Sequence, residues 1–370
     1  MIKLNLLTTR ASRKNPYLFH HIALSPLLAR AEGNKASNRG PEQQTFDEKA
    51  FQIFVQQQGL APMWDEMLRQ SNTPFTFSND FSKALHQARL QSAGLYLAQK
   101  EALNSTNEIL GTKNIVHVVY KGAHHREQYY TEPSLRPALD IDILIDEKDK
   151  FSAIKAFRRE GFDLVARAKD ISHEVGLKKG AIAIDLHWDI LRPGRTKIPI
   201  TRELLKTRKN YDNYWGMNDE SSLFVMLVHP VFAKYGTAPQ ARLMRLIDLT
   251  LLLEQRNIQW QEVLQLLAIT GLKTAAWLTL KWLEKLTGIK PAANITEALK
   301  PGVFRQQYFN YWLDKNLATS LLKHPKLIQL GFTLPAHDRL SGAVQAVRRA
   351  RKLKRSQQSE LTNLLAETQI

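Results

Sequence analysis

The stretch RPALDIDILID, residues 136–146, places acidic side chains inside an otherwise apolar, β-branched run. Side chains alternate across a strand, so such a run presents one apolar face and one acidic face. The expected apolar face consists of Leu139, Ile141, Ile143 and Ile145, and the acidic face of Asp140, Asp142 and Asp146. Successive side chains on one face lie about 6–7 Å apart, which lets Asp140 and Asp142 converge on one cation. The alternative is the solvated face of an edge strand.

The run AIAIDLHWDI, residues 181–190, repeats this alternation and carries Asp185, His187 and Asp189 on its polar face. If the two runs are neighbours in one sheet, Asp185 joins the acidic pair of the first run. Three close carboxylates repel one another and take up protons unless a cation neutralises them. Oxygen ligands favour Mg²⁺ or Mn²⁺ over zinc. The chain has no cysteine, which excludes thiolate zinc sites and disulfides.

The whole chain has a globular composition with a strong positive charge. Its 370 residues, 44% of them hydrophobic, are enough for two or three domains. The net charge of +17 attracts polyanions such as nucleotides, nucleic acid or an anionic membrane surface. No apolar run reaches the roughly 18 residues that a membrane-spanning helix needs. The expected location is the cytoplasm, and an organelle transit segment in the basic residues 1–31 is the alternative.

The order of helical and β-rich segments predicts an α+β fold with a sheet-based middle domain between helical regions. No internal repeat is visible. The expected divisions are a basic N-terminal segment and linker at 1–45, an N-terminal helical region at 46–112, a core at 113–215, a C-terminal helical domain at 216–335 and a basic C-terminal helix at 336–370.

This layout resembles the polymerase β-like nucleotidyltransferases. The residues that carry the resemblance are VVYKGA at 118–123, LDIDIL at 139–144 and IDLHW at 184–188. Over roughly residues 80–260 the chain looks more closely like an uncharacterised bacterial nucleotidyltransferase family whose core begins with Lys-Gly. The resemblance implies a polymerase β-like core, a small mixed sheet with helices, flanked by N-terminal and C-terminal helical regions.

The resemblance also implies a reaction and a set of metal ligands. A nucleoside triphosphate such as ATP would bind with Mg²⁺, an acceptor hydroxyl would attack the α-phosphate, and pyrophosphate would leave. Asp140 and Asp142 would be metal ligands. Asp185 would hold the catalytic metal and could help to deprotonate the acceptor. The acceptor stays open: a sugar, a small metabolite, a protein side chain or an RNA end.

The expected nucleotide-binding residues are Lys121, Gly122, Arg136 and His187. Most of the superfamily has Gly-Ser after the first strand, whereas Gly122 is followed by Ala123. Lys121 is therefore the expected phosphate contact. Arg136 is expected to pair with phosphate or with one of the acids. His187 has three open roles: metal ligand, acid or base, or hydrogen-bond partner beneath the sheet.

Other charged and histidine side chains are expected to be structural. The nearly all-apolar run ARLMRLIDLTLLL, residues 241–253, predicts a buried ion network, with nucleotide or acceptor contact as the alternative. Its charged members are Arg242, Arg245 and Asp248. His229 is expected in the core. His124 and His125 are expected to be exposed, with a role at the phosphate site as the alternative.

Two functions from other classes compete with catalysis. One is a nucleotidyltransferase-like protein that senses a nucleotide or a partner without turnover. The other is a basic nucleic-acid-binding protein, since VRRARKLKR at residues 347–355 offers a possible polyanion contact. An isolated charged helix is also a common form of solvated surface.

Overall fold

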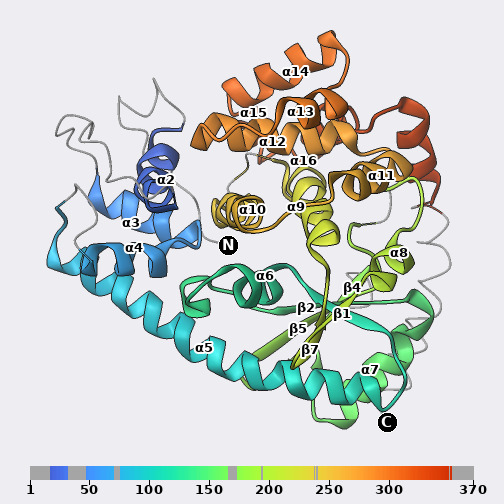
Figure 1. The fold of residues 1–370 in the computed structure, drawn as a ribbon. Coiled ribbons are helices and arrows are strands. Elements are labelled where there is room, and N and C mark those ends of the chain that lie inside the picture. Colours follow the sequence, from blue (N-terminus) through green and yellow to red (C-terminus); the bar gives the residue numbers. More distant parts are fainter. Residues whose placement is uncertain are drawn as a thin grey trace.

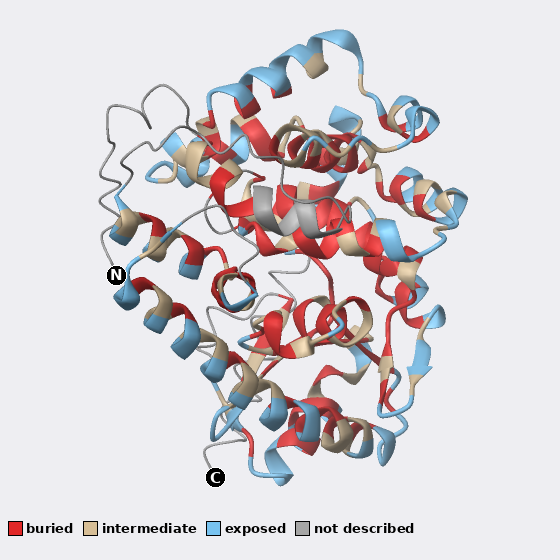
Figure 2. Cartoon of the chain, turned by 60° about the vertical axis from the view of Figure 1, so that its left-hand side comes forward, coloured by how far each residue is buried: buried red, intermediate tan, exposed pale blue. Residues whose placement is uncertain are grey.

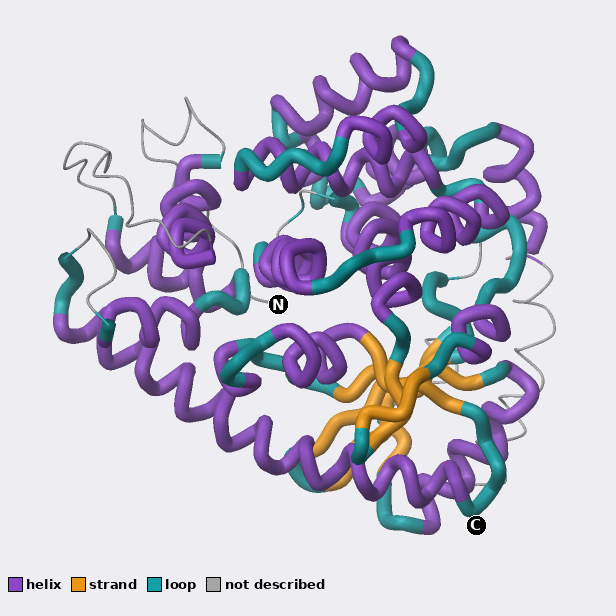
Figure 3. Tube along the Cα trace, viewed as in Figure 1, coloured by secondary structure: helices purple, strands orange, loops and turns teal. Residues whose placement is uncertain are grey.

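The computed structural model describes residues 17–31, 47–70, 76–165, 173–192, 195–236, 238, 241–349 and 351. The expected α+β class is confirmed: one mixed sheet of seven strands lies among many helices (Figures 1 and 3). Within these residues no helix combines the length and the apolar character that crossing a membrane requires.

The strands follow the spatial order β3-β4-β5-β2-β1-β7-β6. Their bounds are β1 His117–Tyr120, β2 Ile141–Ile145, β3 Asp163–Leu164, β4 Glu174–Lys179, β5 Ile182–His187, β6 Lys209–Tyr211 and β7 Tyr214–Gly216. Strand β2 runs antiparallel to β1 and parallel to β5, and β5 runs antiparallel to β4. Because β2 is an interior strand, the edge-strand alternative for the acidic run is wrong.

Both faces of the sheet are covered, which the alternation of one apolar and one acidic face did not predict. Ile141, Ile143 and Ile145 pack in one core with side chains of α5, Asn79–Gly111, and α7, Lys150–Arg159. Leu144, on the face of Asp142, packs in a second core with the C-terminal helices. The acidic face of β2 is therefore buried under helices rather than open to water.

The helices of the N-terminal part lie beside and beneath the sheet. They are α2 Leu18–Ala31, α3 Glu48–Gln57, α4 Ala61–Arg69 and the long α5. Helix α5 runs along the lower side of the molecule in Figure 1 and covers the face of the sheet opposite to α6, Lys121–Tyr129. The short helix α8, Thr201–Lys206, contacts β2. Short turns lie at Pro133–Leu135 and Glu147–Asp149.

The C-terminal helices stack above the other face. They are α9 Asp219–Lys234, α10 Met244–Gln255, α11 Trp260–Thr270, α12 Lys273–Thr287, α13 Ala293–Leu299, α14 Val303–Asp314, α15 Leu317–Ser320 and α16 Pro325–Ile328, followed by a π turn at Gln329–Thr333. Helix α9 is buried along nearly its whole length. Figure 2 shows buried residues on the inward sides of the helices and exposed residues on their outer sides. Asn218 begins it by accepting a hydrogen bond from the backbone N–H of Ser221 at 3.0 Å.

One hydrophobic core joins the helical parts to each other. It includes Phe51 and Phe81 of the N-terminal helices, Leu144 of the sheet, Trp277 of α12 and Phe332 near the C-terminal end. The helices that cover the acidic face are thus anchored to both ends of the chain. The domain boundaries proposed above stay predictions.

Candidate active site

The pairing of β2 with β5 brings two of the expected acids together. Asp142 of β2 lies directly opposite Asp185 of β5 in the parallel register. Oxygen atoms of both acids and a ring nitrogen of His187 lie within 4.8 Å of one another, which is close enough for one metal ion. Asp140 lies in the bend before β2, since the strand begins at Ile141, and lines the same cavity. The structure therefore assembles three carboxylates from two segments far apart in sequence.

The carboxylates differ in protonation because their neighbours differ. Burial and the adjacent acids Asp140 and Asp142 raise the pKa of Asp185 to about 7. Burial and Asp142 also raise the pKa of Asp140. Burial disfavours ionisation of Asp142 as well, but Lys121 and His187 outweigh it and hold the Asp142 pKa well below its usual range. A cation between the carboxylates would relieve the repulsion that raises the pKa values of Asp140 and Asp185.

Lys121 and Gly122 are the first residues of α6, directly after β1, and line the same cavity as the acids. Nζ of Lys121 lies 2.7 Å from Oδ1 of Asp142, and the Lys121 backbone is left-handed with φ 55°. A Cβ on Gly122 would lie closer to Nη1 of Arg136 than van der Waals contact allows, so glycine permits this close approach. Of the expected nucleotide-binding residues, Lys121 and His187 contact Asp142, whereas Gly122 lies against Arg136.

Arg136 pairs with an acid of α10. Its Nη2 lies 2.7 Å from Oδ2 of Asp248 and its Nε lies 3.1 Å from Oδ1. Tyr130 and His125 also contact Asp248, at 2.8 and 3.2 Å. Although burial opposes ionisation, these partners hold the pKa of Asp248 below its usual range. The carboxylate that lies closest to Arg136 is therefore Asp248 and not one of the acids on the sheet.

The ion network expected within residues 241–253 differs from the observed one. Asp248 pairs with Arg136, as above, whereas Arg245 contacts His229, with Nη1 to Nδ1 at 3.2 Å. Nε of Arg245 is buried without a hydrogen bond. Burial and the charge of Arg136 lower the pKa of Arg245 to about 10. Sequence spacing alone did not predict this arrangement because the partner of Asp248 comes from a different segment.

A cavity of about 400 Å³ is lined by both acidic and basic side chains. Its acids are Asp140, Asp142, Glu174, Asp185 and Asp248. Four of its basic side chains, here called the basic wall, are Arg192, Lys234, Arg242 and Arg245. Burial lowers the pKa of Lys234, and the nearby charges of Arg245 and Lys121 lower it further. Cations crowded in this way favour an anionic ligand.

A larger cavity of about 680 Å³ lies elsewhere, among α11 to α14 and the C-terminal helix. Its acid, Asp338, accepts hydrogen bonds from the backbone N–H groups of Lys273 and Thr274 at 3.1 and 2.7 Å. That carboxylate has a structural role at the start of α12. The smaller cavity combines a carboxylate cluster with cations and is the better candidate for chemistry.

A family of uncharacterised nucleotidyltransferases matches residues 44–288 of the chain. The chain belongs to this nucleotidyltransferase family. The matched part includes the β1–α6 turn, both acid-bearing strands, α9 and α10. The resemblance inferred from the motifs is confirmed, and a role in nucleotidyl transfer is supported. No curated protein matches the chain.

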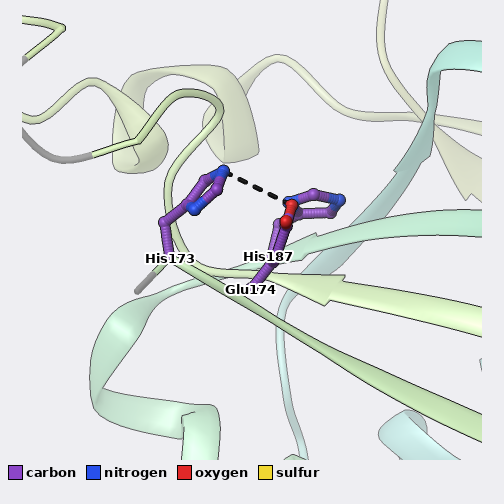
Figure 4. A group of neighbouring side chains, drawn as sticks. All are labelled: His173, Glu174 and His187. Carbon is purple, nitrogen blue, oxygen red and sulfur yellow. Dashed lines mark ion pairs between the residues drawn. The ribbon is translucent and has the colours of Figure 1, made fainter. Parts of the chain in front are cut away.

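Two residues of the candidate site were not found from the sequence. His173 and Glu174 lie beside His187 (Figure 4), with Nε2 of His173 3.3 Å from Oε2 of Glu174. His187 directs Nε2 toward Oδ1 of Asp142 at 2.9 Å and Nδ1 toward Oε2 of Glu174 at 3.1 Å. Only the antiparallel register of β4 with β5 could have shown that Glu174 lies opposite His187.

The structure contradicts the expectation for His124 and His125 and agrees with that for His229. His124 and His125 are buried, so the expectation of exposure is wrong. Nδ1 of His124 lies 3.1 Å from the hydroxyl of Tyr214, while His125 contacts Asp248. His229 is buried as expected, although it also lines the cavity. Helix α6 is buried along its inner side, which the polar letters KGAHHREQY did not indicate.

Asp189, which follows β5, pairs with Arg349 near the end of the described chain. Strand β5 ends at His187, so Asp189 no longer shares the face of Asp185 as expected; its Oδ2 lies 2.6 Å from Nη2 of Arg349. Arg349 is thus paired within the protein, whereas Arg348 is exposed. Lys352, Lys354 and Arg355 of the basic segment lie outside the described residues.

Proposed function

We propose that the protein transfers a nucleoside monophosphate from a nucleoside triphosphate to an acceptor hydroxyl. The observation that carries this proposal is the cavity that is lined by Asp142 and Asp185 on adjacent strands and by the basic wall. In the reaction the acceptor oxygen forms a bond to the α-phosphorus. The bond between the α-phosphorus and the bridging oxygen breaks, and pyrophosphate leaves with the electron pair.

Asp140, Asp142 and Asp185 would hold Mg²⁺ or Mn²⁺. Their hard oxygen donors suit these ions, and the raised pKa of Asp185 is the expected property of a carboxylate that is awaiting a cation. When bound, such an ion supplies charge stabilisation for the attacking and leaving oxygens. Asp185 could also accept the proton of the acceptor hydroxyl.

The triphosphate tail would lie between the β1–α6 turn and the basic wall. Lys121 is the expected phosphate contact, which requires its ammonium to leave Asp142 as the cation and nucleotide arrive. Arg136 borders the same space beside Gly122, and Arg245 and Lys234 face it from the helices. Ala123 stands where most of the superfamily has a serine. These basic side chains would supply the phosphate contacts instead.

The experiment compares transfer of label by the wild type with transfer by Asp142→Ala. The purified chain is incubated with α-labelled nucleoside triphosphates, Mg²⁺ and a cell extract as the source of acceptor. We expect label on an acceptor with the wild type and at least about 100-fold less with Asp142→Ala. Asp146→Ala is the matched control, since this acid lies at the end of the same segment and pairs with Arg202. Equal transfer by Asp142→Ala would overturn the proposal.

A second candidate is a nucleotide sensor without turnover. The contact of Lys121 with Asp142 favours it, because an internal ammonium can substitute permanently for a metal ion. In that case the wild type binds triphosphate but transfers no label, and Lys121→Ala changes the stability of the fold rather than nucleotide affinity. Weaker nucleotide binding by Lys121→Ala supports the enzyme.

A further inference from the structure

We propose that His173, Glu174 and His187 form a second metal site, which binds a divalent transition-metal ion of the zinc class (Figure 4). This site adjoins the carboxylate centre, and His187 lies between the two. The proposal does not depend on nucleotidyl transfer.

The backbone holds the three side chains in place. Glu174 lies directly opposite His187 in the antiparallel pairing of β4 with β5, so both side chains project from the same face. The carbonyl of His173 accepts a hydrogen bond from the backbone N–H of Trp188 at 2.8 Å, which extends this pairing by one residue. The site is therefore built on the sheet and not on a loop alone.

The distances between the ligand atoms fit one ion. Oε2 of Glu174 lies 3.3 Å from Nε2 of His173 and 3.1 Å from Nδ1 of His187. Ligand atoms about 2.0–2.1 Å from a tetrahedral zinc ion are about 3.3 Å apart. The nearness of the two distances to this value indicates a preformed set of two imidazoles and one carboxylate.

One ring nitrogen of His187 has no hydrogen-bond partner. Nε2 lies 2.9 Å from Oδ1 of Asp142, so Nδ1 is the nitrogen that points away from the carboxylate centre. This buried Nδ1 makes no hydrogen bond, yet it lies 3.1 Å from Oε2 of Glu174. A metal ion bound by both atoms would satisfy this nitrogen.

Lys121 limits where a further positive charge can lie beside His187, because its ammonium is 3.4 Å from Nε2. A metal ion bound at Nδ1 places its charge on the opposite side of the ring, next to Glu174. Asp142 then orients His187 in the way that a carboxylate commonly supports a zinc-bound histidine.

The surroundings favour a zinc-class ion over Mg²⁺. Two of the three ligands are imidazole nitrogens, from His173 and His187, and the third is the carboxylate of Glu174. Imidazole nitrogen suits zinc and related ions, whereas Mg²⁺ prefers oxygen. The Glu174 side chain is 37% exposed, which gives the ion a route from solvent and leaves room for a water ligand.

The test measures zinc binding by the full, untagged chain. The protein is stripped with a chelator and dialysed against Zn²⁺ with Mg²⁺ in excess, and bound zinc is measured by mass spectrometry. We expect about one zinc ion per chain with the wild type, and affinity at least about 10-fold weaker with His173→Ala and Glu174→Gln. His324→Ala, an exposed histidine elsewhere, and Asp185→Asn, in the carboxylate centre, should both retain zinc.

Cobalt(II) provides a readout that does not depend on the variants. Cobalt bound by two imidazoles and a carboxylate with few ligands gives strong visible bands, which zinc should remove by competition. Circular dichroism checks that each variant is folded. The proposal is overturned if the wild type binds no zinc under these conditions, if folded His173→Ala binds zinc as the wild type does, or if the cobalt spectrum is that of the free ion.

Discussion

Asp142 and Asp185 lie on neighbouring strands, and a few contacts shift their pKa values in opposite directions. Asp142 touches Lys121 and His187, so its charged form is favoured despite burial. Asp185 faces other acids, so its charged form is disfavoured. Groups with such different pKa values in one cavity can divide the tasks of metal binding and proton transfer between them.

The raised pKa of Asp185 predicts that affinity for Mg²⁺ or Mn²⁺ increases with pH up to about 7. Below this value a proton must leave before the ion can bind. Without metal, a raised pKa in the folded state contributes stability at low pH that is lost as pH rises through about 7. Calorimetric titration over about pH 5.5–8 in two buffers would measure the affinity and the released protons. An affinity that is independent of pH in the wild type would contradict this assignment.

Removal of the Asp248 carboxylate is predicted to destabilise the protein. Asp248→Ala leaves the guanidinium of Arg136 buried without its partner, which costs about 3–5 kcal/mol of unfolding free energy. Because the pKa of Asp248 is lowered, its contribution is present above the ordinary pKa and is lost as pH falls. Urea unfolding measures the change. The exposed pair of Asp314 with Lys285 provides the control, since Asp314→Ala should cost less than about 1 kcal/mol.

At the scale of the element, the turn between β1 and α6 depends on a glycine for a reason of space. Arg136 lies against Gly122 and is fixed there by its two contacts with Asp248. The motif VVYKGA placed a glycine after the first strand, but it did not predict which side chain would cover the glycine. That information comes from a contact with a segment beyond the next helix.

Two glycine substitutions are predicted to have opposite effects on stability. Gly122→Ala places a Cβ against the fixed guanidinium of Arg136 and should destabilise the protein by about 1–3 kcal/mol. Gly94→Ala lies on the exposed side of α5 with nothing nearby, and should stabilise the helix by about 0.5–1 kcal/mol. Urea midpoints of both variants test this. Destabilisation of the same size by both would show that the cause is not the contact with Arg136.

Strands with alternating apolar and polar residues were the elements that the sequence predicted best. Period-two alternation around Asp142 and Asp185 indicated both strands, and their shared acidity indicated that they meet. The basic wall and Glu174 could not be found in this way. Lys234 and Arg245 reach the cavity only because α9 and α10 pack across the sheet, and the pattern of one helix does not specify which face another element will meet.

Over the whole chain, only part of the net charge of +17 is accessible to a binding partner. Part of it faces the acids across the cavity, and part is used in pairs between distant segments. Arg349 pairs with Asp189 across 160 positions and connects the C-terminal helix to the end of β5. A run of basic letters therefore overestimates the charge that a polyanion can reach, because sequence does not show which members turn inward.

This distinction gives a prediction with a closely matched control, since Arg348 and Arg349 are adjacent and carry the same charge. Arg349→Ala leaves the buried carboxylate of Asp189 without its arginine and should destabilise the protein by about 2–3 kcal/mol in urea unfolding. Arg348→Ala removes one charge from an exposed position and should change stability by less than about 0.5 kcal/mol. Burial already raises the pKa of Asp189 against the effect of Arg349, so the loss of Arg349 should raise it further. If RNA binding is the role of this helix, both variants should instead weaken RNA binding equally and leave stability unchanged, because a phosphate contact responds to charge and not to an internal pair.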